Sequence, residues 1–140
     1  MRLSTKGRYA LEALVVLCLK SDDKKNISLT EICKETSLSQ RYLDQLFRDL
    51  KNHGIVISKK GKTGGYHLAK PPADITVGDI LRSVEGSLTP VKCIDNEYCD
   101  RVDSCITRDL WIDVYTELNS VVDNITLNSL VDKYKRKLAG

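Results

Sequence analysis

The chain has 140 residues, of which 41% are hydrophobic and 29% charged, an ordinary globular composition that excludes wholesale disorder. The length suits one compact domain with an appended element. No apolar run approaches the roughly 18 residues of a membrane span, and no signal-peptide pattern follows the first residues. We therefore expect a soluble, cytoplasmic protein with no membrane partner.

The net charge of +3 conceals an uneven distribution. Residues 1–72 carry 14 Lys and Arg against 7 Asp and Glu, whereas residues 73–140 carry 8 against 12. A basic half joined to an acidic half favours contact of the first half with a polyanion, although an unevenly charged solvated surface would give the same count.

The first predicted element is an amphipathic helix, whose apolar residues recur at helical spacing: Leu11, Leu14, Val15 and Cys18. A polar loop follows over residues 21–26. Ser28 and Glu31 form a predicted capping box, in which each side chain bonds the other residue's backbone N–H. This box opens a short second helix, whose inward residues are Leu29, Ile32 and Cys33.

A third helix follows, with Ser39 as a suitable N-cap and an end near Gly54, which can take the left-handed conformation. Its apolar face consists of Leu43, Leu46, Phe47 and Leu50. Its polar face consists of Gln40, Arg41, Asp44, Gln45 and Arg48. Two short helices joined by a tight turn, the second with a hydrogen-bonding face, predict a helix-turn-helix.

Two β-prone segments, Ile55–Ser58 and Tyr66–Ala69, flank a Gly-rich turn and predict a hairpin. Thr76 then caps a further helix, which Gly86 ends. Residues 89–104 look irregular, and a long helix starts at about Ile106. Its apolar stripe consists of Trp111, Val114, Tyr115, Leu118, Val121, Val122 and Ile125. Residues 124–126 interrupt it, and Thr126 caps a last helix.

The predicted recognition helix would present its N-terminal residues to base edges in the major groove. Arg suits guanine, Gln suits adenine, and Asp can accept from the cytosine amine. Lysines at the hairpin tip would neutralise phosphates and so fix position rather than sequence. The predicted DNA-contacting residues are Ser39, Gln40, Arg41, Tyr42, Asp44, Gln45, Arg48, Lys59, Lys60, Lys62, Thr63 and Gly64. The alternative is a helical hairpin of unrelated fold with a solvated polar face.

The five cysteines fall into two groups. Cys18 and Cys33 lie on apolar helix faces and are interpreted as small core residues. Cys93, Cys99 and Cys105 are spaced C-x5-C-x5-C in a polar, loop-like segment. Three such thiols can converge on one metal centre, and soft thiolates favour an iron–sulfur cluster or zinc. The spacing alone does not choose between cluster, zinc and disulfide switch.

Six short segments, spread over nearly the whole chain, match one known family. They are residues 1–10, 42–46, 64–66, 76–80, 84–86 and 124–127. Together they resemble the IscR-type winged-helix iron–sulfur regulators, the group of IscR, NsrR and CymR relatives, with the IscR branch the most similar. Members of this family are dimers whose long C-terminal helices cross, and many hold an iron–sulfur cluster on a three-cysteine loop.

The resemblance implies that Cys93, Cys99 and Cys105 ligate a cluster, with a two-iron two-sulfur form favoured and a four-iron four-sulfur form as the alternative. Cluster state would control DNA affinity, commonly at promoters of iron–sulfur assembly genes. The stripe from Trp111 to Ile125 would join a homodimer on a pseudo-palindromic operator of double-stranded DNA.

The expected fold class is mostly α with a small β-hairpin, divided into three parts. Residues 1–72 would form the winged helix-turn-helix DNA-binding region. Residues 73–105 would form a connecting helix and the cysteine-bearing cluster loop. Residues 106–140 would form the long dimerisation helix and the C-terminal helix.

The fourth cluster ligand departs from the family pattern. IscR takes it from a histidine three residues after the last cysteine, where this chain has Arg108, a protonated donor without a lone pair. Nitric-oxide-sensing relatives use an N-terminal aspartate, where this chain has Arg8. The substitutes left open are an exogenous small molecule or an acidic side chain: Asp95, Glu97, Asp100, Asp103 or Asp109. Asp44 also replaces a glutamate that influences site choice, so the operator need not carry over.

We therefore predict a DNA-binding transcriptional regulator, in the first instance a repressor, and not an enzyme. The chain has no Cys-x-x-Cys motif, dinucleotide-binding fingerprint or acid–base constellation. One alternative keeps the fold and senses nitric oxide or thiol oxidation. A more remote alternative is a small redox or cluster-carrier protein.

Overall fold

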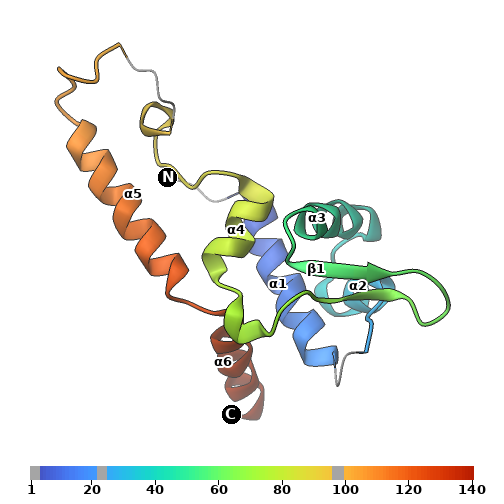
Figure 1. Cartoon of the computed structure of the whole chain (residues 1–140). Coiled ribbons are helices and arrows are strands. Elements are labelled where there is room, and N and C mark those ends of the chain that lie inside the picture. The colour runs from blue at the N-terminus through green and yellow to red at the C-terminus, as the bar shows by residue number, and fades with distance from the viewer. Residues whose placement is uncertain (1–3, 22–24, 96–99) are drawn as a thin grey trace.

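The computed structural model describes residues 4–21, 25–95 and 100–140, and these ranges form six α-helices and one two-stranded hairpin (Figure 1). The helices are α1 (Thr5–Lys20), α2 (Leu29–Thr36), α3 (Gln40–Asn52), α4 (Val77–Glu85), α5 (Arg108–Asp123) and α6 (Leu127–Ala139). The strands are β1 (Val56–Lys59) and β2 (Gly65–Leu68), with 3-10 turns η1 (Pro72–Asp74) and η2 (Lys92–Ile94) in the connections. The predicted fold class is confirmed. Within the described ranges, no helix is long and apolar enough to cross a membrane.

The three predicted helix caps at Ser39, Thr76 and Thr126 are confirmed. Each side-chain oxygen accepts a backbone N–H from the first turn of its helix, at 3.0 to 3.1 Å. At α4 the bond is reciprocal, because the Asp79 carboxylate accepts the backbone N–H of Thr76 at 3.1 Å. These local bonds fix where α3, α4 and α6 begin.

The predicted capping box at Ser28 is only half formed. The Ser28 hydroxyl accepts the backbone N–H of Glu31 at 3.2 Å, as predicted. The Glu31 carboxylate, however, accepts from the Ser28 hydroxyl at 3.5 Å and not from the Ser28 backbone. One hydroxyl thus serves both bonds, and α2 still begins where the sequence predicts.

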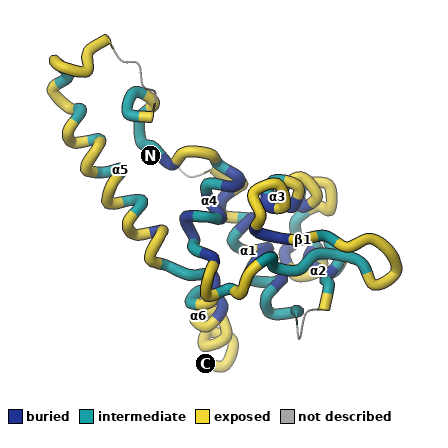
Figure 2. Tube along the Cα trace, viewed as in Figure 1, coloured by how far each residue is buried: buried dark blue, intermediate teal, exposed yellow. Residues whose placement is uncertain are grey.

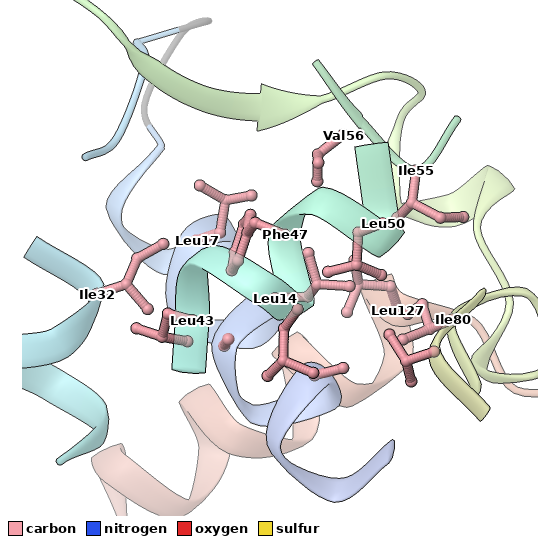
Figure 3. Packing of buried hydrophobic residues seen from close by; sticks show 14 of the residues in the cluster. Leu14, Leu17, Ile32, Leu43, Phe47, Leu50, Ile55, Val56, Ile80 and Leu127 are labelled. Carbon is pink, nitrogen blue, oxygen red and sulfur yellow. The ribbon is translucent and has the colours of Figure 1, made fainter. Parts of the chain in front are cut away.

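The helix-turn-helix consists of α2 and α3, joined by a three-residue turn. Ser37 takes the left-handed conformation, with φ 61°, which reverses the chain directly after α2. Helix α3 ends at Asn52, and Gly54 just beyond it takes the left-handed conformation expected of it, with φ 75°, where its N–H donates to the carbonyl of Lys51 at 3.1 Å. All four predicted apolar residues of α3 are buried in the core: Leu43, Leu46, Phe47 and Leu50. Figure 3 labels three of them, Leu43, Phe47 and Leu50, among the packed side chains.

Helix α1 lies at the centre of the core and begins earlier than the predicted stripe. Its buried residues include Ala10, Ala13, Leu14 and Leu17. Leu11, Val15 and Cys18 are only half-buried and pack at the edge of the same cluster. The buried face is displaced from the predicted stripe because α2, α3, α4 and α6 all contact α1, and its alanines allow this close approach.

The hairpin pairs β1 with β2 in antiparallel register, from Val56 opposite Leu68 to Lys59 opposite Gly65. Ile27 extends this sheet: its N–H donates to the Tyr66 carbonyl at 2.9 Å, and the Tyr66 N–H donates to the Ile27 carbonyl at 2.8 Å. This pairing needs glycine at position 65, because a Cβ there would lie 2.5 Å from the Ile27 carbonyl oxygen and its φ is 140°.

Helices α4 and α6 share the core of the helix-turn-helix. Their starts are joined by two backbone bonds of 2.8 Å, from the Val77 N–H to the Ile125 carbonyl and from the Leu127 N–H to the Ile75 carbonyl. Ile80 and Leu127 are fully buried in the main cluster (Figure 3). The core therefore crosses the predicted boundary at residue 72, and the three-part division stays a prediction.

Helix α5 projects away from this body, and the end nearest the cysteine loop is largely exposed (Figures 1 and 2). It begins at Arg108 and not at Ile106, which is 94% exposed. The predicted apolar stripe divides in two. Four of its residues pack in a second, smaller cluster with α4: Tyr115, Leu118, Val122 and Ile125. On the adjoining side, Leu110 and Val121 are 53% and 56% exposed.

Candidate nucleic-acid interface and cysteine loop

The polar side of α3 faces solvent beside the hairpin (Figure 2). It exposes all the predicted recognition residues but one: Ser39, Gln40, Arg41, Asp44, Gln45 and Arg48. The Arg48 guanidinium donates to the Asp44 carboxylate at 3.0 Å, which holds two opposite charges one turn apart. Among the described residues, Arg41 and Gln45 make no side-chain hydrogen bond, so their donors are available to a ligand.

Tyr42 is the exception, because it packs inward. Its ring meets the ring of Tyr9 edge to face, with centroids 5.8 Å apart. Its hydroxyl oxygen is buried and has no hydrogen-bond partner within the described part of the chain. Tyr42 therefore ties α3 to α1, and its predicted contact with DNA stays a prediction.

The hairpin tip exposes the predicted wing residues Lys59, Lys60, Lys62 and Thr63. The chain turns at Gly61, with φ 110°, and the Gly64 N–H donates to the Gly61 carbonyl at 3.0 Å. A Cβ on Gly64 would lie 2.4 Å from the Lys59 carbonyl oxygen. Gly64 is thus required by the turn itself, whatever it contributes to DNA contact.

Asn26 and His67 anchor the wing, and sequence reasoning missed this contact. The Asn26 amide donates to the Thr63 carbonyl at 3.2 Å. Its Oδ1 lies 2.6 Å from Nδ1 of His67 on β2. One side chain thus holds both the tip and a strand of the hairpin. Asn26 and His67 are 41 positions apart, so no local pattern points to the pair.

Cys18 and Cys33 are half-buried against the main core, in line with the packing role predicted for them. Burial raises the pKa of the Cys18 thiol to about 11, against a smaller lowering by Lys135. A thiol with so high a pKa is protonated and unreactive at neutral pH.

The cysteine loop connects α4 with α5. Cys93 lies in η2, which contacts α5, and Cys105 lies three positions before α5; Cys99 falls outside the described residues. Hydrogen bonds from the backbone and side chain of Thr107 lower the pKa of Cys105, with smaller contributions from the Arg108 backbone and the Arg101 charge. The lowered pKa favours the thiolate, which is the form that binds metals.

The positions considered for a fourth ligand are exposed wherever they are described: Asp95, Asp100, Asp103 and Asp109. Glu97 lies outside the described ranges. Arg108 is half-buried, and the guanidinium of Arg8 lies 5.9 Å from the ring centroid of Tyr9, a cation–π distance. Within residues 4–21, 25–95 and 100–140, no three His, Cys, Asp or Glu side chains converge as a metal site.

Comparisons with known proteins agree with this architecture. Residues 3–133 match the Rrf2 family, described as an iron-dependent transcriptional regulator. The chain is 39% identical over 132 residues to the HTH-type transcriptional regulator IscR of Yersinia enterocolitica, covering 94% of this chain and 80% of that one.

Two solved structures are similar over nearly the whole chain. CymR, the global cysteine regulator of B. subtilis, has a TM-score of 0.78 and 37% identity, covering 95% of this chain and 98% of CymR. IscR of T. potens has a TM-score of 0.76 and 34% identity, covering 96% of this chain and 88% of IscR.

Proposed function

Because the chain belongs to the Rrf2 family of transcriptional regulators, we propose that it is a homodimeric repressor whose DNA affinity depends on an iron–sulfur cluster bound by Cys93, Cys99 and Cys105. A two-iron two-sulfur cluster is the favoured form, and the similarity to IscR suggests iron–sulfur assembly genes as targets. One observation carries the proposal: the thiolate-prone Cys105 lies three positions before α5, the helix that joins the cysteine loop to the DNA-binding body.

The exposed face of α3 supports DNA readout. Recognition helices place such residues at base edges, and Arg41 and Gln45 carry the donors and acceptors that read guanine and adenine. The wing lysines, with Lys60 between β1 and the turn at Gly61, would contact phosphates beside the groove. The proposed contact set is the one predicted from the sequence, with Ser39 and Gly64 also serving the local structure.

The donor set suits a soft metal centre. Three cysteines without a Cys-x2-Cys pair are unusual for structural zinc, and thiolates favour iron–sulfur clusters. A bound cluster would supply a centre that responds to iron, oxygen and redox state. Since Arg108 and Arg8 cannot ligate, an exposed carboxylate or a small molecule would complete the shell and leave the cluster easily lost, which suits a sensor.

The exposed side of α5 supports a dimer. Leu110 and Val121 are more than half exposed and lie three helical turns apart on a projecting helix, an exposure of large apolar side chains that favours an interface. A second copy packed there would bring two recognition helices onto one duplex, a helical turn or a multiple apart. A pseudo-palindromic operator would match that symmetry.

A second candidate keeps the fold and changes the signal. The lowered pKa of Cys105 would also make its thiol prone to oxidation, and CymR, a similar structure, is a cysteine regulator by name. A disulfide switch between loop cysteines, or a response to nitric oxide, would then control DNA binding without a resident cluster.

The test is anaerobic purification, with iron and sulfide counted per chain, for the wild type, Cys105→Ala and Cys33→Ala. We expect iron and sulfide in the wild type and in Cys33→Ala, which is the matched control, and their loss in Cys105→Ala. A duplex selected from a random pool should then bind the loaded protein and the cluster-free protein with different affinities. Metal-free wild type after reconstitution would refute the cluster and favour the thiol switch.

A further inference from the structure

Thr107 uses its side chain differently from the other residues that start helices. Thr76 and Thr126 cap α4 and α6 by accepting a backbone N–H of their own helix. Ser4, Ser28 and Ser39 do the same at α1, α2 and α3. Thr107 is the N-cap of α5, yet its hydroxyl makes no such bond. The usual role of a threonine at this position therefore does not account for its side chain.

The Thr107 hydroxyl lies between an indole and a thiol. The Trp111 Nε1 donates to Thr107 Oγ1 at 3.2 Å, and Thr107 Oγ1 is 3.8 Å from Cys105 Sγ, within range of a hydrogen bond to sulfur. An indole N–H can only donate, so it occupies a lone pair of the hydroxyl. A sulfur that ligates a metal carries no proton, so in the loaded protein the Thr107 hydroxyl would be the only possible donor of this pair. Trp111 thus holds the Thr107 hydroxyl beside Cys105.

We propose that Thr107 is a positioning residue for the cluster: held by Trp111, its hydroxyl donates to the ligating sulfur of Cys105. This inference rests on the proposed function, because it takes Cys105 as a ligand. Hydrogen bonds to ligating sulfurs help to set the reduction potential of iron–sulfur centres, and a donor stabilises the more negative, reduced form. Loss of such a partner typically weakens metal binding about 10- to 100-fold.

The first measurement compares Thr107→Val, which keeps the shape and removes the hydroxyl, with Thr107→Ser, which keeps the hydroxyl. Thr116→Val is the matched control, since Thr116 also lies on α5 but bonds the Ile112 carbonyl. For reconstituted protein, the midpoint potential is measured together with the rate of loss of visible absorbance in the presence of EDTA.

We expect Thr107→Val to have a more negative midpoint and to lose its cluster roughly tenfold faster or more. Thr107→Ser should restore both values, and Thr116→Val should match the wild type. Trp111→Phe should also make the midpoint potential more negative and the loss of the cluster faster, but by less than Thr107→Val. The Thr107 hydroxyl remains in this variant, but the indole N–H no longer orients it. Far-UV circular dichroism before reconstitution verifies that each variant folds.

The fraction of protein that holds a cluster can be measured by tryptophan fluorescence, because Trp111 is the single tryptophan of the chain. Its emission should be quenched when the wild type is loaded, and the residual emission gives the loaded fraction independently of DNA binding. A loaded Thr107→Val with wild-type midpoint and rate of loss would overturn the inference. So would equal defects in the Val and Ser variants, which would indicate packing alone. A wild type that takes up no cluster would refute the proposed function itself, and this inference with it.

Discussion

The guanidinium of Arg82 on α4 makes two parallel hydrogen bonds to the carboxylate of Asp123, the last residue of α5, at 2.8 and 2.9 Å. The same guanidinium donates to Asn119 at 2.6 Å. The hydrogen bond to Asp123 raises the pKa of Arg82 further, so the pair is charged at every physiological pH. Because the cysteine loop leads into the other end of α5, this clamp fixes the orientation of α5 on the DNA-binding body.

Asp123→Ala should lower the free energy of unfolding by about 1 kcal/mol. A bidentate Arg–carboxylate pair lies at the upper end of surface ion pairs, but solvent screens it because both side chains are about a third or more exposed. Urea unfolding followed by circular dichroism measures the change. Asp132→Ala, an exposed acid on α6, serves as the comparison and should change stability little.

Gly78 makes a sharper test of the same clamp. A Cβ on Gly78 would lie 1.9 Å from the nearest oxygen of Asp123, so Gly78→Ala should displace the carboxylate and destabilise the wild type. With Asp123→Ala already present, only Nη1 of Arg82, 2.7 Å from the added Cβ, has to move, and it is the free end of a flexible side chain. Alanine should then stabilise α4 by up to about 1 kcal/mol over glycine. A double-mutant cycle measures the difference, and equal effects of Gly78→Ala in both backgrounds would contradict the clamp.

Glu85 should stabilise the start of α1. Its carboxylate accepts the Gly7 backbone N–H at 2.8 Å and also bonds the Ser4 hydroxyl, at the positive end of the helix dipole. We expect Glu85→Ala to cost about 1–2 kcal/mol, and Glu85→Gln less, because the amide oxygen can still accept. Thermal and urea unfolding check both values. Glu12 is exposed on α1, and Glu12→Ala is the control, which should change the free energy of unfolding little.

Base readout and phosphate contact should separate in a salt titration. Lys60→Ala should weaken binding to all duplexes alike and reduce the slope of log affinity against log salt by about 1. Gln45→Ala should cost about 1–3 kcal/mol on the preferred site and leave the slope unchanged. Fluorescence anisotropy on specific and random duplexes measures both. Lys137→Ala on α6, at the far end of the body from α3 and the wing, should match the wild type (Figure 1).

Local features of this fold were predictable from the sequence, and contacts between distant segments were not. The caps at Thr76 and Thr126 and the buried face of α3 depend on neighbours within one or two turns. The Asn26–His67 and Arg82–Asp123 contacts each join residues 41 positions apart, so only tertiary packing brings them together.

The candidate site was predictable to a similar degree. The spacing of the cysteines predicts a shared metal or redox site without choosing between a cluster, zinc and a disulfide switch. Thr107 is not singled out from the sequence, because the position of its hydroxyl depends on the contact with Trp111. From the sequence, the whole stripe from Trp111 to Ile125 is assigned to a dimer interface, yet four of its residues pack in the cluster with α4. Sequence alone does not separate a face that packs on its own body from one that faces a second copy, because both are apolar.

Cys18 should make stability fall at alkaline pH. Burial raises its pKa from 9.0 to about 11, so the unfolded chain releases the thiol proton before the folded protein does. The stabilising contribution is therefore complete below pH 9 and is lost as the pH rises from 9 to 11. In Cys18→Ala, the alkaline fall in the free energy of unfolding should be smaller by up to about 2 kcal/mol. The effect stays at or below this value because the thiol is partly exposed and solvent screens it. Urea unfolding at pH 8, 9.5 and 10.5 under reducing conditions measures it, and parallel curves for both proteins would refute it.

Leu110→Asp should disrupt the proposed homodimer and leave a folded monomer. Leu110 is 53% exposed on the projecting part of α5, so a carboxylate there is solvated in a single copy but would be buried without a partner in a dimer seam. Sedimentation velocity should show a loss of the dimer, while circular dichroism stays unchanged. Asp113→Ala, one turn away and exposed, should remain dimeric. The monomer should bind a half-site duplex as the wild-type protomer does, but lose the tighter binding to the full palindrome, because only the dimer places two recognition helices on one DNA. A dimer that persists in Leu110→Asp would exclude this face of α5 as the seam.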